Sequence, residues 1–337
     1  MLPMEEINVS VGSLVKSVNQ NNVRWLCLIL ALVPMLGICS QVKDQDESAV
    51  AGSVEERRDS PIEITVAAGL QYDSSVTVEE LDLTSDVGDF AAVADLDLKY
   101  RKRFDQGTDL RAGYSLSQKS YFDESDFSLQ IHNLSFDLRQ KFGEFDLGLQ
   151  NYNVLSRLDN DELLSFQHIA PYFTTFLSPR LYLRASYFYR NKDFPDNPDR
   201  DGHVNAADAD LYFFIDGTRS YLVFGLLYED ENTRAAEFDF EGTQFSLMYS
   251  RKLDLYGDLP TRLRLDWRYE DRDYQSITPS LGERRDDRRQ RWRARVDLPM
   301  NDQLTVLMTY QHRIHDSNLA SADFDDNRFE VQIEATF

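Results

Sequence analysis

The sequence predicts an all-β fold: a transmembrane, antiparallel, up-and-down β-barrel of about fourteen strands, preceded by a signal peptide. Three observations lead to this prediction. Segments in which apolar and polar residues alternate recur as far as residue 337, the connections between them are short and long in turn, and the polar positions carry many charges. After the N-terminal segment, no apolar run is long enough for a helix that crosses a membrane.

Residues 1–40 have the layout of a secretory signal peptide. An apolar run over residues 25–38 follows a basic residue and ends in small residues. The stretch before Cys39 faintly resembles a lipoprotein box, but Ile38 stands where a small residue is usual, so lipidation of Cys39 and simple cleavage both stay open. The other cysteine, Cys27, lies in the same segment, so we expect no internal disulfide in the mature chain.

Residues 41–60 predict a disordered periplasmic lead-in, and residues 61–337 predict the barrel. The lead-in is acidic and has few apolar residues, and such a composition does not bury enough apolar surface to fold. The whole chain has 58 acidic against 36 basic residues. No nucleic-acid partner is predicted.

Fourteen alternating segments are predicted as strands, each with its apolar residues on one face because side chains alternate with a period of two. In the sixth strand His168 falls on the apolar parity, and parity shifts near residues 131–134 and 240–245 are interpreted as β-bulges or as errors of register. The predicted strands are residues 62–72, 90–100, 110–116, 134–142, 145–149, 164–172, 181–189, 207–215, 222–228, 245–249, 263–269, 292–298, 304–310 and 328–337.

The predicted connections alternate in length. Those after even-numbered strands are short, and those after odd-numbered strands are mostly longer and more acidic. A membrane barrel places short turns on the periplasmic side and long loops outside. A soluble sandwich or barrel of short strands has no reason to sort its loops in this way, and it remains the alternative fold. The longer connections are residues 73–89, 159–162, 190–205, 229–237, 271–287 and 315–326.

The face opposite the apolar residues is predicted to line a polar lumen, which is filled with water unless a loop folds in as a plug. Charges in a dry core would cost several kcal/mol each unless paired. About fourteen strands, about 4.8 Å apart and tilted by about 40°, give a backbone diameter of about 28 Å, too wide for side chains alone to fill. The charged side chains on this face have mixed signs, so they do not form the single-sign ring of a selectivity filter. The predicted lumen-lining residues are Lys99, Arg101, Arg139, Lys141, Arg184, Arg262, Arg264, Asp266, Arg268, Glu270, Arg293, Arg295 and Asp297.

The last ten residues alternate strictly and end on an aromatic residue. Phe329, Val331, Ile333 and Phe337 fall on the apolar face. A terminal Phe that closes such a strand resembles the sorting signal of bacterial outer-membrane barrels. The resemblance implies insertion by the barrel-assembly machinery and a place in the bacterial outer membrane, in contact with its lipid and lipopolysaccharide.

One acidic segment has the spacing of a calcium loop. Asn197, Asp199, Asp201, Asn205 and Asp208 take positions 1, 3, 5, 9 and 12, with a glycine at position 6, as in EF-hand-like loops. The segment also resembles the calcium loop of dockerin modules, although Asn replaces Asp at position 1 and no clear helix flanks it. Ca²⁺ binding is one interpretation and an acidic surface loop is the other. No other cofactor is predicted.

Two further patterns carry weaker hypotheses. The basic run over residues 284–291 could bind lipopolysaccharide headgroups or phosphate at the rim, or form a solvated loop paired with its own Asp residues. The five histidines raise the hypothesis of a barrel hydrolase, but no spacing marks a nucleophile with its base. We therefore predict that the chain is not an enzyme.

Several stretches resemble a known family. Residues 71–76 with the acidic loop after them, and Tyr310 with residues 316–319 and 324–327, look like the fourteen-stranded C-terminal barrel of surface lipoprotein assembly modifiers and related tetratricopeptide-linked barrels. The resemblance covers roughly residues 61–337 and implies work with a surface lipoprotein. That family carries a periplasmic helical-repeat domain before its barrel, where this sequence has only the acidic lead-in.

Two functions follow as hypotheses. In the first, the barrel is a polar passage for solutes or an exported molecule, without covalent chemistry. In the second, it is an assembly or binding platform with an occluded lumen, whose outer loops engage a surface lipoprotein, lipopolysaccharide or Ca²⁺.

Overall fold

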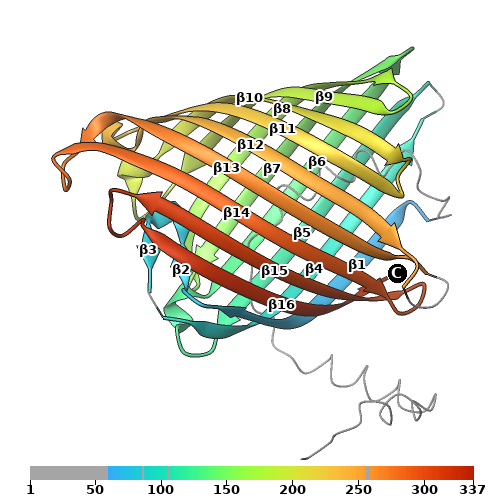
Figure 1. Cartoon of the computed structure of the whole chain (residues 1–337). Coiled ribbons are helices and arrows are strands. Elements are labelled where there is room, and N and C mark those ends of the chain that lie inside the picture. The colour runs from blue at the N-terminus through green and yellow to red at the C-terminus, as the bar shows by residue number, and fades with distance from the viewer. Residues whose placement is uncertain (1–59, 86, 105, 256–258) are drawn as a thin grey trace, which may run out of the picture. The chain divides into compact units, whose positions relative to one another are not determined.

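The computed structural model describes residues 60–337 except residues 86, 105 and 256–258, so the predicted signal peptide and nearly all of the lead-in lie outside the described residues. Within that range the chain forms one closed barrel of fourteen antiparallel strands. Figure 1 shows the strands following one another around a single ring. This confirms the fold class that the alternation predicts.

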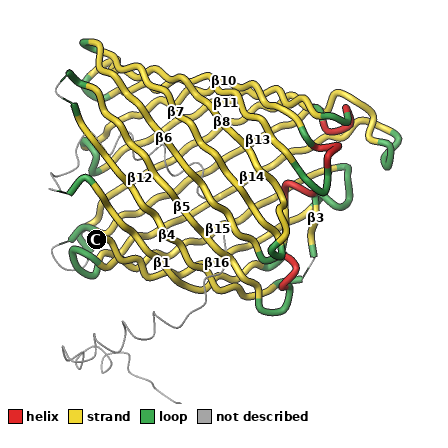
Figure 2. The backbone as a smooth tube through the Cα atoms, turned by 180° about the vertical axis from the view of Figure 1, so that it is seen from behind, coloured by secondary structure: helices red, strands yellow, loops and turns green. Residues whose placement is uncertain are grey.

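Most strands pair with the strands before and after them in the chain, and a separate two-stranded sheet, β2 with β3, lies between β1 and β4. Four short 3-10 turns lie in the connections at one end of the barrel (Figure 2). The strands are β1 (Ile62–Asp73), β2 (Thr77–Val78), β3 (Leu83–Thr84), β4 (Asp89–Arg103), β5 (Thr108–Tyr121), β6 (Leu129–Phe142), β7 (Phe145–Leu158), β8 (Asp161–Ser178), β9 (Leu181–Asp193), β10 (Gly202–Asp216), β11 (Ser220–Thr233), β12 (Phe240–Leu253), β13 (Thr261–Thr278), β14 (Glu283–Pro299), β15 (Leu304–Ser317) and β16 (Phe324–Thr336). The 3-10 turns are η3 (Glu79–Leu81), η4 (Ser125–Phe127), η5 (Pro198–Arg200) and η6 (Ala236–Phe238).

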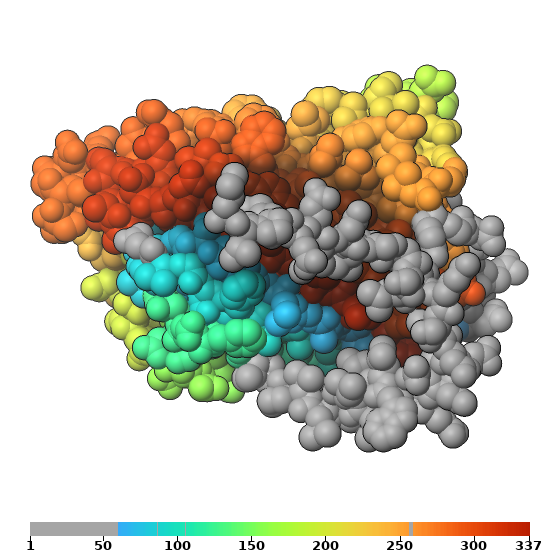
Figure 3. All heavy atoms as spheres, turned by 60° about the horizontal axis from the view of Figure 1, so that its bottom comes forward, coloured from blue at the N-terminus to red at the C-terminus, as the bar shows by residue number. Residues whose placement is uncertain are grey.

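The ring closes where the first strand meets the last. β1 pairs with β16 from Thr65 opposite Thr336 to Asp73 opposite Arg328. Beyond this register the Phe337 amide donates to the Ile64 carbonyl at 2.8 Å. Figure 3 shows the red of the last strands bordering the blue and cyan of the first ones.

Large apolar side chains cover the outside of the barrel. The four apolar residues of the terminal strand, Phe329, Val331, Ile333 and Phe337, are all more than half exposed, and apolar residues of the other strands join them. Such a broad exposed apolar belt marks contact with something other than water, and on a closed barrel it is the lipid-facing band. No helix in the described part of the chain is long and apolar enough to cross a membrane.

The strands are longer than the sequence predicts, and this corrects several loop predictions. Half of residues 190–205 and most of residues 271–287 lie in strands, because β9 and β10 leave only residues 194–201 between them and β13 and β14 only 279–282. The connection after β7 is a two-residue turn in which Asp159 and Asn160 have φ of 47° and 71°, typical of a tight hairpin. The hydrogen bonds between antiparallel strands join backbone groups only. The strands therefore extend beyond the membrane into segments whose side chains are polar.

The predicted facing of the sixth strand, β8, is wrong. His168, Ala170 and Tyr172 are buried inside the barrel, whereas Ile169 is exposed outside. The prediction took Leu164 and its apolar neighbours as facing the lipid, whereas these residues point inward and pack on the connection between β1 and β4. The pairings of β6 and β12 run without a register shift through residues 131–134 and 240–245, so no bulges lie there.

Candidate functional site in the barrel lumen

The connection between β1 and β4, residues 74–88 and called L1 below, folds into the outer mouth of the barrel. Val78 pairs with Leu83, and Asp82 takes the left-handed conformation, φ 53°, that closes the small hairpin. Val76 and Val78 are buried, the latter in a cluster with Leu164 and other apolar residues. L1 is thus seated by apolar packing, although its sequence is acidic.

L1 reaches across the mouth to the opposite wall. Around the ring, the connection between β9 and β10 lies on the far side from β1. Arg200 in that connection donates to the Asp82 carboxylate at 2.7 Å and to the Glu80 carbonyl at 2.9 Å. The loop therefore spans the lumen at the end where the longer connections lie.

A buried arginine of the wall holds the tip of L1. Arg285 of β14 donates to both oxygens of Asp82, at 2.9 and 2.7 Å, and to both oxygens of Asp287, at 2.8 and 2.7 Å. Its side chain is only 2% exposed. Paired forks of this kind are among the strongest hydrogen bonds that side chains form, so Asp82 is firmly tied to β14.

A second arginine, Arg313 of β15, binds a second carboxylate of L1. It pairs with Glu79 and donates to the Thr77 hydroxyl at 2.9 Å. It also pairs at 2.6 Å with Asp326 of β16, which accepts a hydrogen bond from the Ser75 amide at 3.2 Å. We call the ion pairs of Glu79 and Asp82 with Arg313, Arg285 and Arg200 the L1 latch.

The latch carboxylates stay ionised. Burial alone would raise their pKa values, but Arg313 and Arg289 lower the pKa of Glu79 to about 2, and Arg285 with Arg200 lowers the pKa of Asp82 to about 2. For Glu80 the balance is reversed, since burial and the charge of Glu79 raise its pKa. The latch therefore persists over the whole neutral and mildly acidic range.

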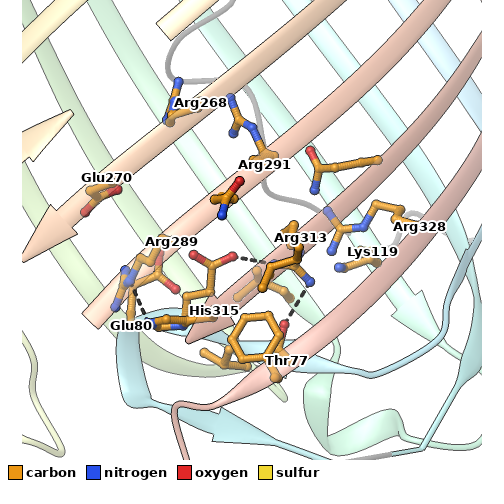
Figure 4. Close-up of a pocket in the computed structure, with 17 residues that line it drawn as sticks. Thr77, Glu80, Lys119, Arg268, Glu270, Arg289, Arg291, Arg313, His315 and Arg328 are labelled. Carbon is orange, nitrogen blue, oxygen red and sulfur yellow. Dashed lines mark hydrogen bonds and ion pairs between the residues drawn. The ribbon is translucent and has the colours of Figure 1, made fainter. Parts of the chain in front are cut away.

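L1 leaves a cavity on each of its sides. One, of about 260 Å³, lies against β13–β16 and is shown in Figure 4, where Arg268, Arg291 and Arg313 extend into it from neighbouring strands. The other, of about 220 Å³, lies against β8–β13 and is lined by Arg190 and Arg272 among others. Glu79 and Glu80 line both cavities, so the turn of L1 divides the mouth.

The predicted lumen-lining residues lie on the parity opposite the exposed apolar residues, and most meet an oppositely charged or aromatic side chain. Lys141 and Arg262 lie near the short turns, and for Arg268 no ion pair to a described residue is found. The contacts are Lys99 to Glu63 at 3.7 Å, Arg101 and Arg139 to Asp109 at 3.5 and 2.5 Å, Arg264 and Arg295 to Asp297 at 2.6 and 2.8 Å, Arg293 to Asp266 at 2.8 Å, Arg272 to Glu270, and Arg184 over the Tyr172 ring at 4.1 Å.

Sequence reasoning missed the latch. It treated residues 284–291 as a basic rim, but this run lies in β14 and alternates: Arg285 and Arg289 point into the barrel, whereas Arg284 and Arg288 are exposed. The alternation inside a charged run was the available signal. Nothing in the acidic L1 sequence shows that the loop turns inward.

The predicted calcium segment does not form a loop of twelve residues. Asn205 and Asp208 lie in β10, where they accept hydrogen bonds from the hydroxyls of Tyr187 and Ser186. Asp201 accepts from the Phe194 amide at 2.7 Å, while Asn197 and Asp199 lie at η5. In the described part of the chain, no group of three or more His, Cys, Asp or Glu side chains is arranged to hold a metal ion.

His315 and Ser317 do not form a hydrolytic pair. His315 contacts Asp287 at 3.1 Å, but the Ser317 hydroxyl donates to that same carboxylate at 2.6 Å. A serine nucleophile needs its hydroxyl proton on the histidine. The geometry here is that of a structural network around Asp287.

Comparison with known proteins identifies the family to which the chain belongs. The sequence model of the surface lipoprotein assembly modifiers matches residues 94–337, whereas no curated protein matches the chain. Among solved structures, the chain is similar to an anion-selective porin from Comamonas acidovorans (9% identity, TM-score 0.49, covering 82% of this chain and 98% of the porin). It is also similar to a loop L8 deletion mutant of OmpT, an outer membrane protein of Vibrio cholerae (8%, 0.48, 82% and 99%). The chain belongs to the surface lipoprotein assembly modifier family, and it is a fourteen-stranded barrel of the bacterial outer membrane.

Proposed function

We propose that the barrel is a polar passage across the outer membrane for an exported molecule, narrowed at its outer mouth by L1, and that it serves the assembly of surface lipoproteins. The family description supports the second part. The first part is supported by the wall behind the lipid-facing residues, which carries charged side chains from β4 to β16. Such a wall is stable only in contact with water or with counter-charges.

The observation that carries the proposal is the way L1 is held. Hydrogen-bonded ion pairs between L1 and β14, β15 and η5 fix the loop, and each latch arginine of the wall has a second carboxylate there, Asp287 or Asp326. The arginines thus keep a partner when L1 moves away. A loop with two such states suits a passage that opens for its cargo.

Planar-bilayer recording tests the proposal. The wild-type barrel is expected to give small ohmic steps, because the cavities on both sides of L1 leave room for hydrated ions. The same preparation is checked for folding by its shift in gel migration on heating. A folded barrel that conducts no ions, with L1 either latched or released, would contradict the passage. That result would favour the second candidate, an assembly platform with an occluded lumen. The position of L1 across the mouth also supports this second candidate.

Acid is expected to open the mouth only near pH 2. The folded-state pKa values of Glu79 and Asp82, both about 2, lie below the unfolded values of about 4.3 and 3.9. The latch thus contributes its full stability above about pH 5 and loses it as the pH falls through about 2. We expect the conductance ratio of wild type to Glu79→Gln/Asp82→Asn, which lacks the ion pairs, to stay constant from pH 7 to pH 5, to rise as the pH falls further, and to approach one near pH 2. A ratio that already reaches one at pH 5 would contradict this.

A further inference from the structure

Three arginines form one row across the wall of the larger cavity. Arg268 of β13 lies directly opposite Arg291 of β14, and Arg291 lies directly opposite Arg313 of β15. Neighbouring strands are about 4.8 Å apart, and like charges directly opposite one another destabilise a sheet. An arrangement of this kind calls for counter-charge from the cavity.

The described residues do not supply that counter-charge evenly. Arg313 has Glu79 and Asp326. The carboxylate nearest to Arg291 is Asp266, at 3.8 Å, and Asp266 is already bound by Arg293 at 2.8 Å. For Arg268, no ion pair or hydrogen bond with a described residue is found.

The guanidinium groups of Arg268 and Arg291 are therefore available to a ligand. The Nε atoms of both are buried and have no hydrogen-bond partner among the described residues. Figure 4 shows the two side chains close together at the cavity, on adjacent strands, away from the turn of L1. Of the other cations that line the cavity, Lys119 and Arg328 share Asp73 at 3.7 and 2.5 Å, and Arg289 pairs with Asp287 at 3.1 Å.

We propose that the cavity binds a phosphate monoester group between Arg268 and Arg291. Each guanidinium presents a planar fork that matches phosphate oxygens. A phosphate monoester carries about −1.5 to −2 charges at pH 7, which matches two arginines, whereas a carboxylate would leave one uncompensated. The 260 Å³ cavity holds such a group with a small ester.

The site goes beyond the passage function and does not depend on conduction. The phosphate can belong to a small soluble ester or to a headgroup such as that of lipopolysaccharide, and both present the same group to the arginines. In either case the ligand lies beside Glu79 and Glu80, which line the same cavity.

Isothermal titration of the full chain in detergent micelles tests the site, with glycerol 3-phosphate as the probe at constant ionic strength. We expect Arg268→Gln/Arg291→Gln to weaken binding at least tenfold. The matched control, Arg284→Gln/Arg288→Gln, removes two exposed arginines from the charged run of β14 that also contains Arg291. This control should bind like wild type. Because the first variant relieves like-charge repulsion, it should fold fully, as heat-modified gel migration will show. Arg268→Lys/Arg291→Lys, which keeps charge but loses the forks, should bind with intermediate affinity.

A second arm identifies the source of the phosphate. Displacement of glycerol 3-phosphate by micellar lipopolysaccharide supports the site with a headgroup as its ligand, and displacement by inorganic phosphate alone supports it with a soluble ester. Equal affinity of wild type and Arg268→Gln/Arg291→Gln, or no binding by wild type, would overturn the proposal. Acetate that binds as tightly as glycerol 3-phosphate would overturn the assignment to phosphate.

Discussion

Removing both latch carboxylates of L1, by Glu79→Gln with Asp82→Asn, is expected to raise the mean single-channel conductance several-fold. Asp82 accepts three hydrogen bonds from Arg285 and Arg200, and Glu79 pairs with Arg313. Hydrogen bonds to charged groups contribute about 1.5–3 kcal/mol each. Weakening those of two carboxylates shifts the balance between closed and open L1 on the order of 100-fold or more.

The variant should still fold, because neither latch arginine of the wall, Arg285 or Arg313, is left buried without a carboxylate. Arg285 keeps Asp287 and Arg313 keeps Asp326. The reverse experiment, removal of Arg285, would instead leave Asp82 and Asp287 without their common partner inside the barrel. A missing partner of that kind costs about 3–5 kcal/mol, so substituting the arginine would confuse opening with unfolding.

A matched control separates opening from the change in net charge. Asp123→Asn/Asp126→Asn removes two exposed carboxylates from the neighbouring connection between β5 and β6. We expect its conductance to equal that of wild type. Equal conductance of wild type and Glu79→Gln/Asp82→Asn, with both folded by heat-modified migration, would show that L1 does not limit the passage.

The alternation of the sequence was sufficient to predict the barrel, because lipid contact enforces it. On a strand such as β16, every second residue must be apolar to face the lipid, and Phe329, Val331 and Ile333 are indeed exposed outside. Register then follows from the pattern, since a slip by one residue would turn the apolar face inward. The lengths of the strands were not predictable in this way, because nothing enforces alternation beyond the membrane.

The L1 latch and the lumen-lining residues were only partly predictable, because no lipid contact constrains the side chains inside the barrel. A lumen imposes no pattern, so charged residues such as Arg264 and Arg293 could be assigned to the inner face, but their partners, Asp297 and Asp266, could not be predicted. The inward course of L1 leaves one trace in the sequence. Leu164 and Phe240 are apolar on the inner parity of their strands, and both line the smaller cavity beside L1. Leu164 lies in one apolar cluster with Val78 of L1, and Phe240 lines the cavity beside the loop. The parity shift at residues 240–245 was interpreted as a bulge or an error of register, whereas it marks the wall that faces L1.

A methyl group at Gly69 is expected to weaken the closing seam of the barrel. Gly69 lies opposite Gln332 in the pairing of β1 with β16. A Cβ there would overlap the Val331 carbonyl oxygen and lie 2.7 Å from the Gln332 Cα. Both are backbone atoms, so no side-chain rotation relieves the contact, and β16 itself must move.

Gly69→Ala should therefore lower the free energy of unfolding by about 1–3 kcal/mol, the usual penalty of overpacking, and reduce the fraction that migrates as a closed barrel in unheated samples. Gly113→Ala on β5 is the matched control. Its Cβ meets the Ser135 hydroxyl at 2.7 Å, which can rotate away, and the nearest backbone atom, the Leu98 oxygen, is 3.6 Å distant. Replacing glycine without strain stabilises by about 0.4–1 kcal/mol, so we expect this control to be neutral or slightly more stable. Urea midpoints that agree between the two variants would mean that the seam tolerates displacement, and that ring closure does not depend on the close approach of β1 and β16 at Gly69.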